Sequence, residues 1–264
     1  HMRGCREHAA EAQAAWPRQV SYLHGCDVNY NNPQLGKDLI RIMNALGYGV
    51  RLLDREKCCG VALISNGLYK QARRQAETNL ASIRTAVNDR KMDVITTSST
   101  CTFTLRDEYP HLLELRNEDV RDHIELATRY LYRLLQKNRG RLKFKDTTPL
   151  RVAYHTPCHM EKMGWAYYSI ELLRMIPGVE VIVLDSQCCG IAGTYGITQE
   201  HHRPSQAVGE PLFRPTHASD ADLVATDCEP CHPTTQTLTD NHCAHPVPIR
   251  THRLPPPAHP GART

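Results

Sequence analysis

Long apolar stretches are missing from this sequence. No run approaches the ~18 apolar residues that a membrane-spanning helix needs, and the first residues lack the apolar segment of a signal peptide. The formal net charge is only +4 over 264 residues, and no stripe of Lys and Arg is interleaved with aromatic residues. These absences argue against an integral membrane protein, an exported protein and a nucleic-acid-binding protein.

Motifs for nucleotide cofactors are missing as well. The sequence contains no flavin, nicotinamide or phosphate-loop glycine motif. Because the protein part of a dehydrogenase works through such a cofactor, the sequence predicts no dehydrogenase active site and no catalytic residue of its own.

Cysteine, in contrast, is abundant, with 11 in 264 residues. Because no export signal is present, we expect a cytoplasmic chain with reduced thiols, and disulfide pairing is the less favoured alternative. Cys-Cys-Gly occurs at 58–60 and again at 188–190, which is 130 residues later. Nine of the 11 cysteines occupy positions that repeat with a spacing of about half the chain. The repeated cysteines are Cys26, Cys58, Cys59 and Cys101 in the first half, and Cys158, Cys188, Cys189, Cys228 and Cys231 in the second.

The segments between these cysteines alternate between strand-like and helix-like patterns. This order predicts an α/β fold with two duplicated halves, each a small parallel sheet with crossover helices. Each cysteine group follows a strand, and the carboxyl ends of parallel strands share one edge of a sheet, so we expect the cysteines of each half to meet there. The expected strands are 20–26, 50–54, 93–99, 151–158, 179–185 and 222–228, and the expected helices are 35–47, 68–88, 119–136 and 164–175.

The same patterns divide the chain into domains. The helix at 119–136 carries an apolar stripe typical of core packing, with a partner-facing or membrane-facing helix as the alternative. The last residues are rich in Pro and His and predict a disordered tail. The expected ranges are a leader at 1–19, a first domain at 20–136, a linker at 137–150, a second domain at 151–242 and the tail at 243–264.

The two cysteine sets suit iron–sulfur chemistry, because a cluster needs about four thiolates in a sheltered pocket. The second half offers five thiols, whereas the first offers four and carries Ser98 in place of the fifth. Gly60 and Gly190 allow the backbone to approach a cluster closely and to donate N–H groups to sulfur.

Other interpretations of the cysteines stay open. Zinc also binds four thiolates, so one half is a candidate structural zinc site. The segment from Cys228 to His232 fits the C-x-x-C-H pattern of haem attachment, and its C-x-x-C spacing also fits a thioredoxin-like redox site. A metal-free cysteine core is a further alternative. His24, His155 and His159 are either cluster-bonding or proton-relaying residues, or ordinary histidines of strand ends and loops.

Five stretches of the sequence resemble the CCG, or cysteine-rich, domain family across residues 20–231. This family includes heterodisulfide reductase B subunits and iron–sulfur subunits of glycolate and lactate oxidation. The most similar branch is that of the iron–sulfur C subunits of anaerobic glycerol-3-phosphate dehydrogenases. The stretches are GCDVNYNNPQLGK (25–37), KCCGVALISNG (57–67), TSSTCTFTLRDEYPHLL (97–113), YHTPCHMEKMGW (154–165) and LDSQCCGIAGTYG (184–196).

The resemblance implies a function for the repeated cysteines. They are expected to bind [4Fe–4S]-type clusters, with a non-cubane arrangement where five cysteines are present and zinc as the alternative in one half. Electrons would pass from flavin-bearing dehydrogenase subunits through this chain to menaquinone, at the cytoplasmic face of the inner membrane, with a peripheral attachment to the membrane surface. A heterodisulfide-reductase-like enzyme, an iron–sulfur protein of lactate or glycolate oxidation and a structural zinc-binding module are the alternatives.

The sequence also departs from the pattern of this family. The C subunits carry a ferredoxin-like segment with two C-x-x-C-x-x-C-x-x-x-C-P runs ahead of the repeat, and neither run is found here, so we expect a shortened version. Pro215 and Pro233 fall where the family would place helices, which leaves the end of the second domain less well defined.

Overall fold

The computed structural model describes residues 11–137, 142–144, 148–239 and 242–254. Two four-stranded sheets organise these residues, and every strand pair in both is parallel. Their orders, β2-β1-β3-β4 and β6-β5-β7-β8, are equivalent, which confirms the predicted duplicated parallel sheets. The strands are β1 (Arg18–Tyr22), β2 (Tyr48–Leu52), β3 (Val94–Thr96) and β4 (Ile124–Leu126), then β5 (Leu150–Tyr154), β6 (Val179–Val183), β7 (Leu223–Ala225) and β8 (Cys243–Ala244).

Helices connect the strands of each sheet. Short π-helical turns at Thr85–Asp89 and Thr104–Glu108, and 3-10 turns at Arg121–His123 and Tyr195–Ile197, extend or join them. The first-half helices are α2 (Gly25–Tyr30), α3 (Pro33–Ala45), α4 (Val61–Ser65), α5 (Tyr69–Arg84), α6 (Ser99–Phe103), α7 (Tyr109–Leu113) and α8 (Ala127–Lys137). The second-half helices are α9 (Cys158–Met163), α10 (Ala166–Arg174), α11 (His202–Ala218), α12 (Cys231–Thr239) and α13 (Pro246–His252).

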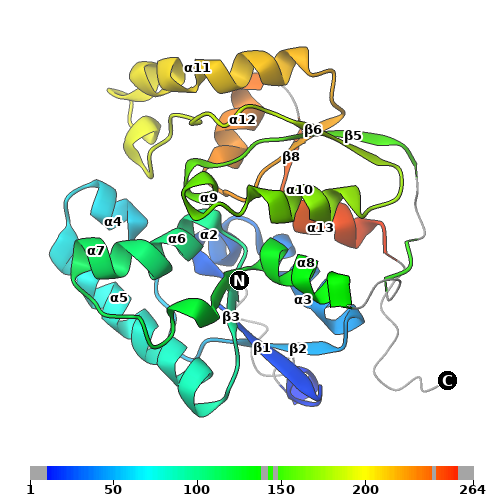
Figure 1. The fold of residues 1–264 in the computed structure, drawn as a ribbon. Helices are drawn as coiled ribbons and strands as arrows, with labels where there is room; N and C mark the ends of the chain where they lie inside the picture. Colours follow the sequence, from blue (N-terminus) through cyan, green and yellow to red (C-terminus); the bar gives the residue numbers. More distant parts are fainter. Residues whose placement is uncertain (1–10, 138–141, 145–147, 240–241, 255–264) are drawn as a thin grey trace.

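The two halves share a core of helices between their sheets. Helices α3 and α8 of the first half pack against α13 and α10 of the second, so that four helices separate the two sheets (Figure 1). One buried apolar cluster accordingly combines Leu39 and Leu131 with Leu172 and Val247 from the other half. On the outer faces, α5 covers the first sheet and α11 covers the second. The halves are therefore packed together through a continuous apolar interior.

Helix α3 shows how local sequence sets these elements. Asn32 caps it by accepting the N–H of Leu35 at 3.3 Å, and Pro33 occupies the first turn, where its missing N–H costs nothing. The apolar residues of the predicted 35–47 helix are buried against the first sheet. Gly47 follows the helix with φ +86°, a conformation that favours glycine.

The expected helix at 119–136 is wrong in its first part. Residues Ile124–Leu126 form β4, which pairs with β3, and α8 begins only at Ala127. All three strand residues are buried, so pairing with β3 outweighs the helical periodicity of the sequence.

The expected tail at 243–264 also begins too early. Cys243–Ala244 is a strand of the second sheet, and α13 follows it. Val247 is buried in the shared core, and the Arg250 guanidinium donates a hydrogen bond to the Leu172 carbonyl at 2.8 Å. These contacts extend the second half through residue 254. Residues 255–264, the first ten residues of the expected leader at 1–19 and parts of the expected linker at 137–150 lie outside the described residues.

The prolines of the second half sit inside helices. Pro211 and Pro215 lie within α11, and Pro233 lies in the first turn of α12. Buried Leu212 and Phe213 hold α11 against the second sheet, which outweighs the helix-breaking tendency of its prolines. In the part of the chain that the structure describes, no helix has the length and apolar character that crossing a membrane requires.

Candidate metal centres

The cysteines of the first half meet at the carboxyl edge of its sheet. Cys26 lies in α2 after β1, the Cys58–Cys59 pair follows β2, and Cys101 lies in α6 after β3. The Sγ atoms of Cys58 and Cys26 are 3.7 Å apart, and Cys59 bonds to both Cys58 and Cys101. These four residues, here called the first-half sulfur set, are brought together as the strand order predicts.

A cavity of about 760 Å³ opens beside the first-half sulfur set. All four cysteines line it, with Cys26 exposed and Cys58 half-buried. The opposite wall comes from the second half, through Ile191–Ile197, the start of α11 and Glu229. The site is therefore formed by both halves, although all its cysteines come from one.

The second half repeats this arrangement with five thiols. Cys158 begins α9, and the Cys188–Cys189 pair follows β6. Cys228 follows β7, and Cys231 begins α12. The Sγ atoms of Cys189 and Cys231 are 3.1 Å apart, and the Gly190 N–H donates to the Cys188 Sγ at 3.3 Å. Hydrogen bonds between thiols also join Cys158 to Cys188, Cys188 to Cys189, and Cys228 to Cys231. These five residues are here called the second-half sulfur set: Cys158, Cys188, Cys189, Cys228 and Cys231.

The protonation pattern is the same in both sulfur sets. The hydrogen bond between Cys26 and Cys58 lowers the pKa of Cys58 to about 3 and raises the pKa of Cys26. In the second half, a bond from Cys158 lowers the pKa of Cys188 to about 2, and the pKa of Cys158 is raised. In each set, the bond within the pair favours loss of a proton from one of its two thiols, and the remaining thiols release their protons when they bind a metal.

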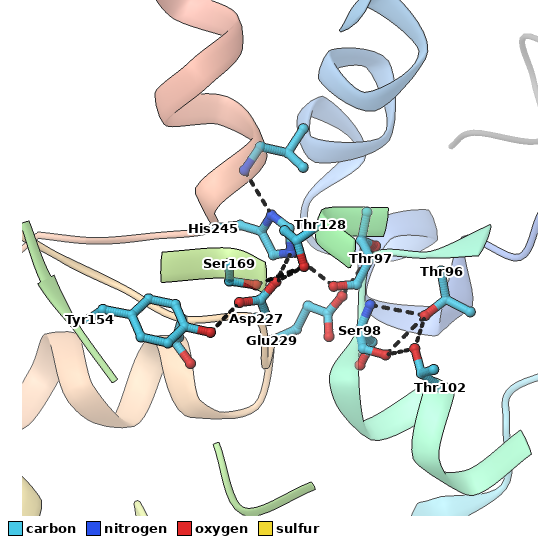
Figure 2. A network of polar contacts seen from close by, with 12 residues as sticks. Thr96, Thr97, Ser98, Thr102, Thr128, Tyr154, Ser169, Asp227, Glu229 and His245 are labelled. Atoms are coloured by element: carbon cyan, nitrogen blue, oxygen red, sulfur yellow. Dashed lines mark hydrogen bonds and ion pairs between the residues drawn. The ribbon is translucent and has the colours of Figure 1, made fainter. Parts of the chain in front are cut away.

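Ser98 and Glu229 distinguish the first site from the second. Ser98 occupies the position equivalent to Cys228 and caps α6, where its Oγ accepts the Cys101 N–H at 3.2 Å. Glu229 reaches across from the second half beside Ser98, and its carboxyl accepts a hydrogen bond from the Thr97 hydroxyl at 3.4 Å (Figure 2). Burial raises the pKa of Glu229 to about 7. A hydroxyl and a carboxyl therefore stand where the second half has its fifth thiol.

A buried polar network joins the two halves beside these sites. The carboxylate of Asp227 accepts hydrogen bonds from the hydroxyls of Tyr154 at 2.6 Å and Thr128 at 2.8 Å (Figure 2). The His245 Nε2 bonds to the Thr97 carbonyl oxygen at 2.8 Å. The sequence pattern did not identify Asp227, Glu229 or His245, because each has a partner, Thr128 or Thr97, in the other half of the chain.

The histidines near the cysteines have different surroundings. His24 Nδ1 lies 2.9 Å from the Gly25 carbonyl oxygen and 3.1 Å from a Glu56 carboxylate oxygen. His159 stacks on Phe103 and bonds to the Thr100 hydroxyl at 3.0 Å, across the interface between halves. Cys243, which lies outside the repeat, packs with Cys189, Cys228 and Cys231 on β8, and burial raises its pKa to about 12.

The donor chemistry of both sets fits an iron–sulfur cluster. Each set presents four or five thiol sulfurs and includes buried cysteines, and a glycine N–H is directed at sulfur in the second half. Among the described residues, no three or more His, Cys, Asp or Glu side chains are arranged to hold a single metal ion.

Comparison with known proteins identifies the family. The cysteine-rich domain pattern, CCG, matches residues 20–106 and 152–235, the two segments that contain the sulfur sets. The chain belongs to this family. The match confirms the resemblance seen in the sequence and the duplication seen in the two sheets.

Individual relatives of this CCG-family chain include redox proteins. It is 58% identical over 245 residues to the C subunit of the anaerobic glycerol-3-phosphate dehydrogenase of Escherichia coli, which covers 93% of this chain and 61% of that relative. It is 28% identical over 217 residues to an uncharacterized iron–sulfur protein of Methanocaldococcus jannaschii, covering 81% of this chain and 40% of the relative. It is 27% identical over 216 residues to lactate utilization protein A of Geobacillus kaustophilus, covering 80% of this chain and 87% of that relative. The chain thus spans less than two thirds of the E. coli relative.

Proposed function

We propose that this chain is an iron–sulfur electron-transfer subunit of an anaerobic glycerol-3-phosphate dehydrogenase. It would accept electrons from a flavin-bearing subunit and pass them toward menaquinone, while attached peripherally to the cytoplasmic face of the inner membrane. The observation that carries this proposal is the pair of sulfur sets on either side of one interface, in a chain 58% identical to the E. coli protein.

The repeated cysteines are the proposed cluster ligands. The first-half sulfur set would hold one centre and the second-half sulfur set another, and [4Fe–4S] is the type we propose for them. When bound, such a group supplies one-electron redox chemistry. The ligand sets are Cys26, Cys58, Cys59 and Cys101, and Cys158, Cys188, Cys189, Cys228 and Cys231.

The rest of the protein would place and shelter these centres. The Thr100 hydroxyl of the first half lies 3.5 Å from the Cys228 Sγ of the second, and Glu229 of the second half lines the first-half cavity. Each half thus contributes a side chain to the surroundings of the other half's sulfur set. This interlocking supports short-range transfer between two centres rather than two independent modules.

A chimera tests the proposal. This chain would replace the matched region of the E. coli protein, and membranes carrying the chimera would be assayed for glycerol 3-phosphate-dependent menaquinone reduction. We expect activity with the intact chain and its loss in the Cys101→Ala and Cys231→Ala variants. Activity that survives both substitutions, or oxidation of glycerol 3-phosphate by the purified chain alone, would refute it.

Disulfide reduction is the second candidate. The cavity beside exposed Cys26 and half-buried Cys58 is favourable for a small substrate that must reach the first-half sulfur set. Reductive cleavage of a disulfide by the anaerobically purified chain with an artificial electron donor would support this activity, and its absence would favour electron transfer alone. A third possibility is that one sulfur set binds a structural zinc ion in place of a cluster, and metal analysis distinguishes it from both candidates.

A further inference from the structure

His155 is a buried side chain whose ring nitrogens have no hydrogen-bond partner in the described part of the chain. It follows β5 directly and precedes Cys158 by three residues. Its residue is 0% exposed to solvent, so water does not reach the ring. Its main-chain N–H donates to the Ala225 carbonyl at 2.9 Å, which fixes the backbone between β5 and β7.

An imidazole always carries at least one N–H, and a buried N–H without an acceptor is strongly unfavourable. Burial lowers the pKa of His155 to about 4, so the ring is neutral and has one donor and one acceptor nitrogen. His155 leads from β5 into the segment that carries Cys158, and Cys188 of the same sulfur set is close enough to act on the ring electrostatically. The missing acceptor is therefore expected on the side of Cys188, within the second-half site.

The repeat provides an internal comparison. Leu23 occupies the same backbone position in the first half, and its N–H donates to the Ile95 carbonyl at 3.0 Å, as that of His155 does to Ala225. Leu23 is also fully buried, but it packs in the apolar core beneath α5. The fold therefore accepts an apolar side chain at this position. The histidine of the second half is not required for folding, which indicates a role in the second-half site.

We propose that the imidazole N–H of His155 donates a hydrogen bond to a sulfur atom of an iron–sulfur centre held by the second-half sulfur set, beside Cys188. This inference rests on the proposed function, because it requires a cluster in that half. Hydrogen bonds to sulfur stabilise the more negative, reduced state of a cluster and raise its reduction potential. His155 is thus a positioning residue that makes the second-half centre easier to reduce than the first-half centre, where Leu23 offers no donor.

Pulsed electron paramagnetic resonance of the reduced protein, labelled with ¹⁵N-histidine, tests this contact. We expect a weak nitrogen coupling that disappears in His155→Leu, which introduces the residue of the first half, and persists in the control His111→Leu, which replaces an exposed histidine. A coupling that is unchanged in His155→Leu overturns the proposal. A strong coupling, typical of nitrogen bonded directly to iron, also overturns it.

Redox titration of the same proteins provides a second measurement. We expect the potential of one centre to become more negative in His155→Leu and to recover in part in His155→Gln, which retains an N–H donor, while the other centre is unchanged. Equal potentials in all variants overturn the proposal. If His155→Leu does not assemble, the wild-type coupling and the Gln variant still decide the matter.

The two proposals fail in different ways. Wild-type protein without iron or sulfide refutes the cluster, and with it the hydrogen bond. Wild-type protein that holds clusters but shows no histidine coupling refutes the role of His155 and leaves the electron-transfer function standing.

Discussion

The main-chain N–H of Ser99 donates a hydrogen bond to the Asp227 carbonyl at 2.8 Å. Ser99 lies in the segment that carries Cys101, and Asp227 precedes Cys228, so this bond joins ligand-bearing segments from the two halves. The two segments occupy equivalent positions in the repeat, each just after the third strand of its half. Each sulfur set is therefore built next to the other, at the junction of the duplicated halves.

Asp227 is expected to hold this junction together. Asp227→Ala would leave the buried hydroxyls of Tyr154 and Thr128 without their acceptor, at a cost of about 2–4 kcal/mol in the free energy of unfolding. Urea denaturation measures the loss. The control Glu210→Ala removes an exposed carboxylate paired with Arg214, and we expect it to cost less than about 0.5 kcal/mol. Similar costs for both variants would contradict this role.

Ser98 is expected to limit the metal content of the first half. Ser98→Cys restores a fifth thiol there, and we expect it to increase the iron retained per chain, although loss of the serine cap of α6 costs about 1 kcal/mol. The reciprocal variant Cys228→Ser should retain less iron than wild type. Iron and sulfide analysis after a timed exposure to chelator measures both. The control Ser65→Cys adds an exposed thiol outside both sets. An equal gain of iron in this control would show that the fifth thiol at position 98 is not the cause.

Buried histidines are expected to make the metal-free protein sensitive to acid. Burial lowers the pKa of His155, His232 and His245 to about 4. In the unfolded chain these histidines take up protons near pH 6.5, whereas in the folded protein they stay neutral down to about pH 4. The free energy of unfolding is therefore at its full value above pH 6.5. It falls as the pH drops from 6.5 toward 4, by up to about 1.4 kcal/mol per histidine and pH unit. Urea midpoints at pH 7.5, 6 and 5 measure the trend, and a midpoint that rises in acid would contradict it.

Glu229 acts in the opposite direction. Its pKa is raised to about 7, so the folded state binds more protons than the unfolded state between about pH 4.5 and 7, and this carboxyl favours folding as the pH falls. Glu229→Gln removes that contribution. The variant is therefore expected to lose stability more steeply in acid than wild type, and an identical pH dependence would show that Glu229 does not titrate in this range.

Gly60 and Gly190 provide a matched test of the two Cys-Cys-Gly turns. Both have positive φ, +95° and +83°, so alanine costs about 1–2 kcal/mol of backbone strain at either position. A Cβ on Gly190 would lie 2.0 Å from the Ser205 carbonyl oxygen, whereas one on Gly60 meets only the side chain and backbone of Ala72 at 3.6 Å or more. We expect Gly190→Ala to destabilise the protein by several kcal/mol more, in thermal denaturation, and equal melting temperatures would contradict this geometry.

The sequence predicted the cysteine-bearing segments of both halves, and it missed the fourth strand of each sheet and the contacts between halves. The spacing of the cysteines and the strand–helix alternation predicted where the sulfur sets form, because parallel strands bring their carboxyl ends together. Strand β4 was mistaken for helix because Ile124 continues the apolar stripe of α8. Asp227 and Glu229 were overlooked because their hydrogen-bond partners, among them Thr128 and Thr97 of the other half, are far away in the chain.

The most direct test of the account is the iron, zinc and acid-labile sulfide content of protein purified without oxygen. We expect about four to eight iron atoms per chain with a matching amount of sulfide. Cys101→Ala should lower the iron and sulfide bound by the first half, and Cys231→Ala should lower the iron and sulfide bound by the second half. Zinc near one per chain with little sulfide, or neither metal, would contradict the assignment of the two sulfur sets as iron–sulfur centres.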